Sequence, residues 1–595
     1  MGSLPEIPDD SALARLFGQE RAQGDAVWFS LPGGQKLYTA GDPADHLYFL
    51  RAGRLGAFRR EPGQEPQFLG VIRPGEPAGE MSLIAGAPHS ADVVALRDSE
   101  IFALPRDAFF EACEDDPSVM IELARLMILR TRQAHSRGPI GEPSVFGFTP
   151  AGQPGALRPV VERLAGEIGR LGYSVATVGA EAASAPVEWF SELEQTHDFV
   201  LYVAETSDDD WRKVVSRQVD RLFRIGRGDR APPADPDGYA SPLQAQGLVD
   251  LILLQPAAAQ APRGSEAWLD AMVPTRLFHL RRDHREDLGR IARVLTGQSV
   301  GLVLSGGGAR AYAHVGAIRA LRERNIPIDF VGGVSMGAII GAGVAIGWDA
   351  AEMDQRIRKA FVDTSPLDDM ALPLLAMTKG VKVAGRLNEH FGDIRIADLW
   401  LPFFCLSSNL TTGAYHPHRR GSLRDALRAT ISLPGILPPA TDGQTVLVDG
   451  AVMKNFPADV MRAGQLGPII GVDVSGARSI TADDVARPSS VWRWIRSGQW
   501  RKGPPIVSLL MRAATVSTGR DLAAAREATD VLVQPDIAKV EIRDWSAYEP
   551  AVEAGYHAMI QALDRLDRPV VDIRRRPSLE EQATARAMKL AAASL

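Results

Sequence analysis

The chain has 595 residues, of which 45% are hydrophobic and 23% charged, and this composition predicts a globular protein of several domains. Its formal net charge of −7 argues against a broad nucleic-acid-binding surface, which would require a strongly basic domain. The two cysteines, Cys113 and Cys405, lack metal-ligand spacing, so we expect neither a disulfide framework nor a cysteine zinc site, and a cytoplasmic location fits. We identify no secretory signal, and the longest apolar stretch, 331–347, is too short and too rich in glycine to span a membrane.

The first predicted domain covers residues 1–135 and is rich in β-structure. Short apolar runs separated by turn residues predict a small β-barrel or jelly roll. Apolar residues at helical spacing over 117–130 then predict a helical tail.

The stretch 74–83, Pro-Gly-Glu-Pro-Ala-Gly-Glu-Met-Ser-Leu, resembles a cyclic-nucleotide-binding domain. In that family a glutamate at the position of Glu80 holds the ribose hydroxyl, and a following arginine pairs with the cyclic phosphate. Here His89 stands where the arginine is expected, and Asp92 adds a negative charge beside the phosphate position. The resemblance therefore predicts the fold and a nucleotide pocket around Glu80 and His89, but a docking or structural role is favoured over nucleotide binding.

Residues 140–290 are predicted to form a Rossmann-like α/β domain. Apolar strands at 144–148, 173–178 and 199–204 alternate with helical segments such as 157–171, which is the pattern of a parallel sheet. The loop 149–155 occupies the place of a phosphate loop but lacks the Gly-Lys-Ser/Thr ending. We therefore expect a degenerate phosphate loop without NTP hydrolysis.

A glycine loop opens the third domain. The predicted strand 300–304 leads into Ser305 and three glycines, Gly306, Gly307 and Gly308, whose backbone amides no side chain shields. Such a loop can hold the oxyanion that forms when a serine attacks an ester. Arg310 would orient the loop or neutralise a substrate phosphate. A dinucleotide-binding loop is the competing interpretation, but Ala311 replaces its last glycine.

Two copies of Gly-x-Ser-x-Gly follow one another closely, and their surroundings distinguish them. Ser299 precedes an apolar run, so its serine enters a strand. Ser335, between Gly333 and Gly337, follows an apolar run and precedes an apolar helix, which is the pattern of a nucleophile elbow. We predict that Ser335 is the nucleophile.

Asp449 ends a third apolar run and is followed by Gly450 and Ala451. A desolvated aspartate within reach of a serine hydroxyl can accept its proton directly. A Ser-Asp-His triad is the alternative, and His557 is the only histidine after Asp449. Because His557 lies in an amphipathic helical segment, it is more simply a helix-surface residue.

These three motifs, in this order, resemble a patatin-like phospholipase domain, here residues 298–575. The module order is similar to that of bacterial relatives of neuropathy target esterase. The resemblance implies a three-layer α/β/α hydrolase with a Ser335–Asp449 dyad acting on acyl esters of phospholipids or lysophospholipids, without metal or organic cofactor. Three features depart from the family pattern: Ala311 in the loop, the missing arginine of the nucleotide pocket, and the absence of an N-terminal membrane helix.

Three tryptophans, Trp492, Trp494 and Trp500, alternate with four cations and predict either peripheral contact with the inner membrane surface or a helix packed on the catalytic core. A different class of function also stays open, namely a regulatory ligand-sensing protein whose hydrolase domain is inactive. The sequence also leaves a homo-oligomer open.

Overall fold

The computed structural model describes residues 27–59, 67–135, 143–153, 155–185, 187–205, 209–234, 243–244, 247–363, 369–371, 376–475 and 519–593. Internal contacts divide the chain into two compact units, each described by itself. Unit 1 comprises Met1–Ala258, Ala267–Gly297 and Arg576–Leu595, and unit 2 comprises Ala259–Glu266 and Gln298–Arg575.

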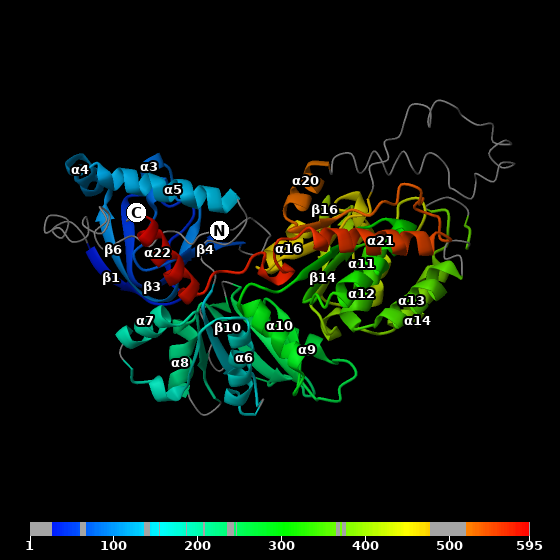
Figure 1. The fold of residues 1–595 in the computed structure, drawn as a ribbon, viewed down its shortest axis with the longest axis horizontal. Coiled ribbons are helices and arrows are strands. Elements are labelled where there is room, and N and C mark those ends of the chain that lie inside the picture. Colours follow the sequence, from blue (N-terminus) through cyan, green and yellow to red (C-terminus); the bar gives the residue numbers. More distant parts are fainter. Residues whose placement is uncertain are drawn as a thin grey trace. The chain divides into compact units, whose positions relative to one another are not determined.

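Unit 1 begins with an antiparallel β-domain, as predicted (Figure 1). Its strands are β1 (Val27–Leu31), β2 (Lys36–Tyr38), β3 (His46–Arg59), β4 (Gln67–Ile72), β5 (Pro77–Ala78) and β6 (Asp92–Pro105). They form one six-stranded sheet in which β3 pairs with β4, β5 and β6. Three helices accompany the sheet: α3 (Glu80–Ala85), α4 (Arg106–Asp115) and α5 (Ser118–His135). The last two confirm the predicted helical tail, since their apolar side chains pack on Leu47, Phe102 and Leu104.

A parallel α/β layer follows in the same unit and confirms the second predicted fold. Its strands are β7 (Val145–Pro150), β8 (Val175–Val178), β9 (Phe199–Val203), β10 (Arg221–Arg227), β11 (Val249–Gln255) and β12 (Leu277–Arg281). Its helices are α6 (Arg158–Arg170), α7 (Val187–Thr196), α8 (Asp209–Gln218), α9 (Ser265–Met272) and α10 (Arg285–Leu295). The strand order is β12-β11-β10-β7-β9-β8, so the order reverses beside β7.

The start of α6, where a phosphate would bind in a nucleotide-binding fold, already carries an anionic group. The carboxylate of Glu205, just after β9, accepts the backbone amides of Leu157 and Arg158, each at 2.9 Å. The carboxylate of Glu205 therefore satisfies these two amides at the start of α6.

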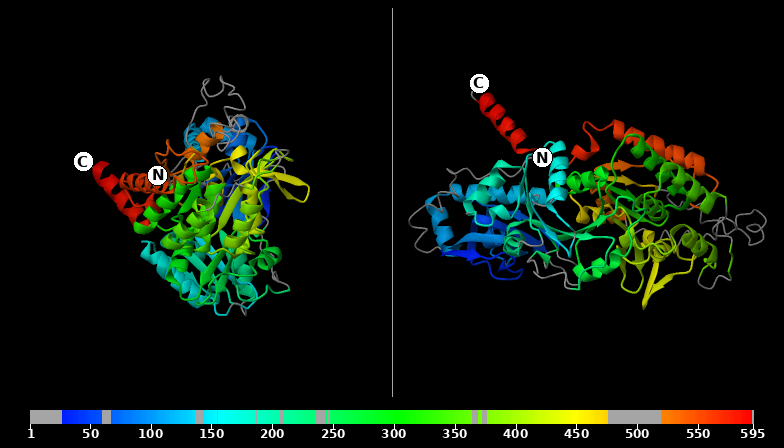
Figure 2. Two further views of the ribbon diagram at one scale, coloured as in Figure 1. Left: turned by 90° about the vertical axis from the view of Figure 1, so that its right-hand side faces the viewer. Right: turned by 90° about the horizontal axis from the view of Figure 1, so that it is seen from below.

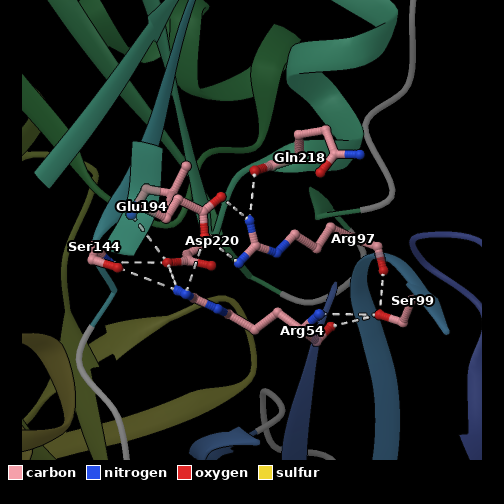
Figure 3. Close-up of polar contacts among 8 residues, drawn as sticks. Arg54, Arg97, Ser99, Ser144, Glu194, Gln218 and Asp220 are labelled. Atoms are coloured by element: carbon pink, nitrogen blue, oxygen red, sulfur yellow. Dashed lines mark hydrogen bonds and ion pairs between the residues drawn. The ribbon is translucent and has the colours of Figure 1, made fainter. Parts of the chain in front are cut away.

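Four charged side chains, three of them buried and one partly buried, join the β-domain to the α/β layer within unit 1 (Figure 3). Arg54 of β3 donates to Asp220, and Arg97 of β6 donates to both carboxylate oxygens of Glu194, with 2.7 Å between Nη2 and Oε2. Asp220 also accepts the amide of Ser144 at 2.9 Å. Burial lowers the pKa of Arg54 to about 10. Burial alone would raise the pKa of Asp220, but the two arginines and its amide donors keep it below its ordinary value.

Unit 2 is built on an eight-stranded mixed sheet with the order β17-β18-β15-β14-β13-β19-β20, in which β16 also pairs with β15. The strands are β13 (Gly301–Leu304), β14 (Phe330–Val334), β15 (Phe403–Asn409), β16 (Ala414–His418), β17 (Ala440–Asp442), β18 (Thr445–Asp449), β19 (Ile469–Val472) and β20 (Val531–Val533). Strands β15, β14, β13, β19 and β20 run parallel. The antiparallel strands, yellow in Figure 2, project from one side of this sheet in both views.

Helices pack on this sheet through its apolar side chains. The helices of unit 2 include α11 (Tyr312–Glu323), α12 (Met336–Ile346), α13 (Ala350–Ile357), α14 (Val381–Phe391), α15 (Leu423–Thr430), α16 (Ala458–Gly464), α20 (Gly519–Glu527) and α21 (Tyr548–Asp564). Helix α12 packs on β13, β14 and β15, and α16 packs on β13 and β19. Helix α22 (Leu579–Ala593) follows in unit 1. No helix in the described ranges is long and apolar enough to cross a membrane.

The topology of this sheet brings three distant segments together. Strands β13 and β14 are parallel neighbours, so the loop after Leu304 and the turn at Ser335 emerge at the same edge. Strand β15 pairs with β14 through Leu406 and with β18 through Ser407, which lies opposite Asp449. The predicted nucleophile therefore follows β14 and the predicted base ends β18, and only β15 lies between these two strands in the sheet.

Candidate active site

The predicted nucleophile Ser335 occupies a sharp turn between β14 and α12. Its backbone has φ 53° and ψ −129°, a conformation that side-chain-bearing residues seldom adopt. The amide of Ser335 donates to the Thr430 hydroxyl at 3.0 Å, and this hydroxyl donates to the carbonyl of Leu406. Val334 and Met336 are buried on either side, whereas Ser335 is partly exposed. The turn therefore presents one hydroxyl group from an otherwise buried segment.

The glycines of this turn are required by close backbone packing. A Cβ atom on Gly337 would lie 2.4 Å from the carbonyl oxygen of Ser305 at the end of β13. A Cβ atom on Gly333 would lie 2.9 Å from the amide nitrogen of Ala338. Any side chain at either position would push α12 away from the sheet, so the two glycines let the turn fit tightly.

Asp449 lies within hydrogen-bond distance of Ser335. The Ser335 hydroxyl donates to Asp449 Oδ2 at 2.7 Å, and the amide of Ala451 donates to Oδ1 at 2.9 Å. A Cβ atom on Gly450 would lie 2.3 Å from the carbonyl of Leu406, so the turn after Asp449 also packs tightly on β15. Asp449 is only 2% exposed, and both of its carboxylate oxygens accept hydrogen bonds.

The burial of Asp449 changes its acidity. Desolvation raises its pKa to about 6, although the Ala451 amide and the Ser335 hydroxyl both act to lower it. The carboxyl group is thus still ionised at neutral pH but holds a proton more tightly than an exposed aspartate. These are the properties that a general base for a serine hydroxyl needs.

The glycine loop lies directly beside the nucleophile. A Cβ atom on Gly306 would lie 3.1 Å from the Cβ atom of Ser335. Gly307 and Gly308 follow and lead into a short 3₁₀ turn, Gly308–Ala311. Arg310 is buried, and its Nε donates to the carbonyl of Val540 at 2.8 Å, so this side chain holds the segment before α21. The loop is therefore adjacent to the side chain of Ser335.

Two other candidates of the sequence lie elsewhere in unit 2. Ser299 is buried, and its hydroxyl donates to Gln465 Oε1 at 3.0 Å. His557 lies on α21 with its side chain 68% exposed, and its Nε2 is 3.7 Å from Glu553 Oε2. The partners of these residues fit a packing serine and a helix-surface histidine, whereas the carboxylate of Asp449 is hydrogen-bonded to Ser335 and Ala451.

The candidate nucleotide pocket of the β-domain contains a stacked histidine. Glu80 and His89 are both buried, and the ring of His89 stacks on Tyr38 with centroids 3.6 Å apart. Burial lowers the pKa of His89, while Asp42 and Glu80 act to raise it. Asp92 is paired with Lys36 at 2.8 Å, so a salt bridge compensates the negative charge that was expected to oppose phosphate.

The tryptophans Trp492, Trp494 and Trp500, for which membrane contact was predicted, lie outside the described residues. Within the site, the sequence did not assign roles to Thr430 and Asn455. Thr430 holds the amide of Ser335, and Asn455 holds Gly306. Their only signal in the sequence was proximity to recognised motifs, because their partners are 95 and 149 residues away.

Comparison with known families matches two stretches of the chain. Residues 302–462 match the patatin-like phospholipase family, and residues 28–116 match the cyclic nucleotide-binding domain. A solved cyclic nucleotide-binding domain from Methylobacillus flagellatus is 29% identical, covers 19% of this chain and 65% of that chain, and has a TM-score of 0.18.

Relatives match nearly the whole chain. An NTE family protein of Mycobacterium tuberculosis (strain CDC 1551) is 31% identical over 552 residues, which are 90% of this chain and 91% of the relative. Neuropathy target esterase sws of Drosophila melanogaster is 28% identical, covering 89% of this chain and 42% of the relative. Patatin-like phospholipase domain-containing protein 6 of Homo sapiens is also 28% identical, covering 89% and 44%. The chain thus spans less than half the length of these two animal relatives.

Proposed function

Because this chain belongs to the NTE family and its residues 302–462 match the patatin-like phospholipase family, we propose that it is a serine esterase acting on the acyl ester bonds of lysophospholipids or phospholipids. The observation that carries this proposal is the hydrogen bond of 2.7 Å between the Ser335 hydroxyl and Asp449. The raised pKa of Asp449 adds support, since burial makes this carboxylate a better proton acceptor.

Acylation begins when Ser335 Oγ forms a bond with the carbonyl carbon of the ester. The hydroxyl proton passes to Asp449 Oδ2, and the carbonyl oxygen becomes an oxyanion beside the glycine loop. Collapse of this intermediate breaks the bond between the carbonyl carbon and the alcohol oxygen. The departing alkoxide takes the proton from Asp449 and leaves as the lysolipid or glycerophosphoryl alcohol.

Deacylation uses the same two residues. A water molecule gives a proton to Asp449 and attacks the acyl group on Ser335. When the second oxyanion collapses, the fatty acid leaves and the proton returns to Ser335 Oγ. Two protein groups therefore suffice for the proton transfers of both steps, which is why no step is assigned to His557.

A fluorophosphonate probe with peptide mapping, together with release of fatty acid from lysophosphatidylcholine, tests the proposal. We expect the probe to modify Ser335, and Ser335→Ala to lose both modification and turnover. Ser299→Ala is the matched control, because it alters the other Gly-x-Ser-x-Gly serine, and it should retain both. Labelling of a different serine, or turnover by Ser335→Ala, would contradict the assignment.

For the β-domain we infer a docking or structural role rather than a cyclic-nucleotide sensor. The support is the neutralising effect of burial on His89 and the acidic groups Asp42 and Glu80 around it, none of which favours an anionic phosphate. We expect cAMP and cGMP at millimolar concentration to leave both the melting temperature and the esterase rate unchanged. Stabilisation by either nucleotide without ester turnover would instead favour the ligand-sensing alternative.

We also infer that Trp492, Trp494 and Trp500, with the neighbouring arginines and lysine, bring this cytoplasmic enzyme to the inner membrane surface. Replacing the three tryptophans by alanine should reduce sedimentation with anionic vesicles and leave hydrolysis of a soluble ester unchanged. Equal sedimentation of both proteins would exclude this role.

A further inference from the structure

An asparagine to which no motif gives a role holds the glycine loop. Asn455 Oδ1 accepts the amide hydrogen of Gly306 at 3.1 Å, and Asn455 Nδ2 donates to the carbonyl oxygen of Gly306 at 3.1 Å. The main-chain carbonyl of Asn455 also accepts the Gly306 amide at 3.4 Å. A carboxamide carries an acceptor oxygen and a donor nitrogen side by side, so Asn455 can hold one residue of the loop through both of its backbone polar groups.

This clamp lies between the nucleophile and the turn that carries Asp449. A Cβ atom on Gly306 would lie 2.6 Å from Asn455 Oδ1 on one side and 3.1 Å from Ser335 Cβ on the other. Asn455 follows Asp449 closely in the chain, after the 3₁₀ turn Gly450–Val452. The same short segment therefore places the carboxylate and fixes the loop.

The hydrogen bonds of the loop show which of its amides are already used. The Gly306 amide donates to Asn455, the Ala309 amide donates to the carbonyl of Ile542 at 2.8 Å, and the Arg310 amide donates to Gly307 at 3.2 Å. Within the described part of the chain, the amides of Gly307 and Gly308 donate to no acceptor. These two amides are the ones left to receive negative charge from a substrate.

We propose that Asn455 is a positioning residue, and that the oxyanion donors it positions are the amides of Gly307 and Gly308 and not that of Gly306. The inference rests on the proposed esterase function and specifies which residue holds its oxyanion loop. An oxyanion site accelerates the reaction only if its donors are fixed before the charge develops. By binding Gly306 on both sides, Asn455 prevents the following peptides from rotating away from Ser335.

The test is to compare Asn455→Asp and Asn455→Ala with the wild type on a soluble ester. In Asn455→Asp a carboxylate oxygen faces the Gly306 carbonyl where an N–H group donated, and a negative charge stands beside the oxyanion. We expect kcat to fall about 100-fold in Asn455→Asp, the size of effect seen when one oxyanion donor is lost, and at least about tenfold in Asn455→Ala. KM should change by less than about threefold, because the ground-state ester makes little use of these donors.

Asn388→Asp is the matched control, since it places the same change on the exposed part of α14, and it should behave like the wild type. The fluorophosphonate reaction rate of the folded protein is the second readout, because the phosphonyl oxygen occupies the same donors. If Asn455 were merely structural, the melting temperature would fall while kcat and the labelling rate per folded molecule stayed at the wild-type values, and that result would overturn the proposal.

A double-mutant cycle with Gly306→Ala adds a geometric check. Alone, the new methyl group would collide with Asn455 Oδ1, whereas in Asn455→Ala this atom is absent. We expect the two losses in kcat to be clearly less than multiplicative, and multiplicative losses would overturn the clamp. A wild-type protein with neither turnover nor labelling would overturn the esterase function and this inference with it. An active wild type with an unaffected Asn455→Asp would overturn the clamp alone.

Discussion

At the nucleophile, one side-chain hydroxyl supports a backbone conformation that is costly for serine. Such φ and ψ values cost about 1–3 kcal/mol and persist only where the surroundings enforce them. Thr430 contributes to this enforcement, because it accepts the Ser335 amide and donates to the Leu406 carbonyl on β15. The position of the Ser335 hydroxyl thus depends on a residue that takes no part in the chemistry.

Replacing Thr430 by valine removes this hydroxyl and keeps the shape of the side chain. We expect kcat/KM to fall by about 10- to 100-fold, because displacements of about 1 Å at a reacting atom have effects of this size. Thr430→Ser keeps the hydroxyl and should stay within about threefold of the wild type. Similar rates for the valine and serine variants would show that the hydroxyl does not position Ser335.

The raised pKa of Asp449 predicts how activity depends on pH. The carboxyl group must be ionised to accept a proton, so kcat/KM should rise through pH 6, near the value of about 6 that burial gives this group. Burial lowers the pKa values of His314 and His418 to about 4, so neither of these histidines titrates in this range. A profile of kcat/KM that is flat between pH 5 and 8 would exclude Asp449 as the base.

The sequence indicates the hydrogen-bonded pair Ser335 and Asp449 but not the residues that hold this pair and its loop in place. Ser335 and Asp449 lie at the ends of apolar runs with glycines beside them, and such local patterns can be recognised in a single sequence. Thr430 and Asn455 act through hydrogen bonds to the backbone of Ser335 and Gly306, which lie 95 and 149 residues away. No periodicity or spacing encodes such a contact, because it depends on which strands become neighbours in the sheet.

Among the secondary-structure elements, β3 and β6 each carry a buried arginine at the contact between the β-domain and the α/β layer. Arg54 and Arg97 are 6% and 5% exposed, and Asp220 is 1% exposed. A buried ion pair contributes little by itself, but removal of one partner leaves an uncompensated charge. Loss of either arginine would therefore leave a carboxylate of the α/β layer without its cation.

Arg54→Met should lower the stability of unit 1 by about 3–5 kcal/mol, since Asp220 would remain buried without its main cation. Differential scanning calorimetry of the full chain would detect this loss, and Arg54→Met with Asp220→Asn should recover part of it. Arg51→Met is the control: Arg51 and Glu100 are 66% and 54% exposed at 3.5 Å, and such a pair contributes about 0–1 kcal/mol. Equal effects of the two single variants would contradict the prediction.

Several strands were predictable from the local sequence, including those that lead to a candidate site residue, but the strand that joins them was not. The apolar runs before Ser305, Ser335 and Asp449 correspond to β13, β14 and β18. Strand β15 (Phe403–Asn409) joins β14 to β18 but was not singled out, because no recognised motif follows it. The order β17-β18-β15-β14-β13 follows from pairing across the chain and is not a local property.

In the whole molecule, the main part of unit 2, residues 298–575, is flanked in the chain by two parts of unit 1. After Arg575 the chain returns to the α/β layer: the Leu579 amide donates to Asp198 at 2.7 Å, and Arg576 stands 4.0 Å over the ring of Phe199. The Tyr173 hydroxyl donates to the carbonyl of Arg576 at 2.8 Å. The last segment of the sequence thus completes the α/β layer and not the hydrolase sheet that precedes it.

Truncation after Arg575 should therefore destabilise unit 1 and spare the esterase site. We expect a lower first melting transition with fluorophosphonate labelling of Ser335 unchanged at 25 °C. Truncation after Leu590, which keeps Arg576 and Leu579, is the control and should melt like the full chain. Loss of labelling with an unchanged melting profile would show that the segment belongs functionally to the hydrolase.

The burial of Asp449 also has a thermodynamic consequence. Folding raises its pKa from 3.8 to about 6, so this group favours the native state most below pH 4, and that benefit disappears as pH rises through 6. A pKa shift of about two units corresponds to about 3 kcal/mol of folding free energy. An asparagine amide in place of this carboxyl group does not ionise, so it would not lose this stability as the pH rises. Asp449→Asn should accordingly melt at a higher temperature than the wild type at pH 8 but not at pH 4, and a lower melting temperature at pH 8 would contradict this. The burial that makes Asp449 a stronger base thus also lowers the stability of the native protein at neutral pH.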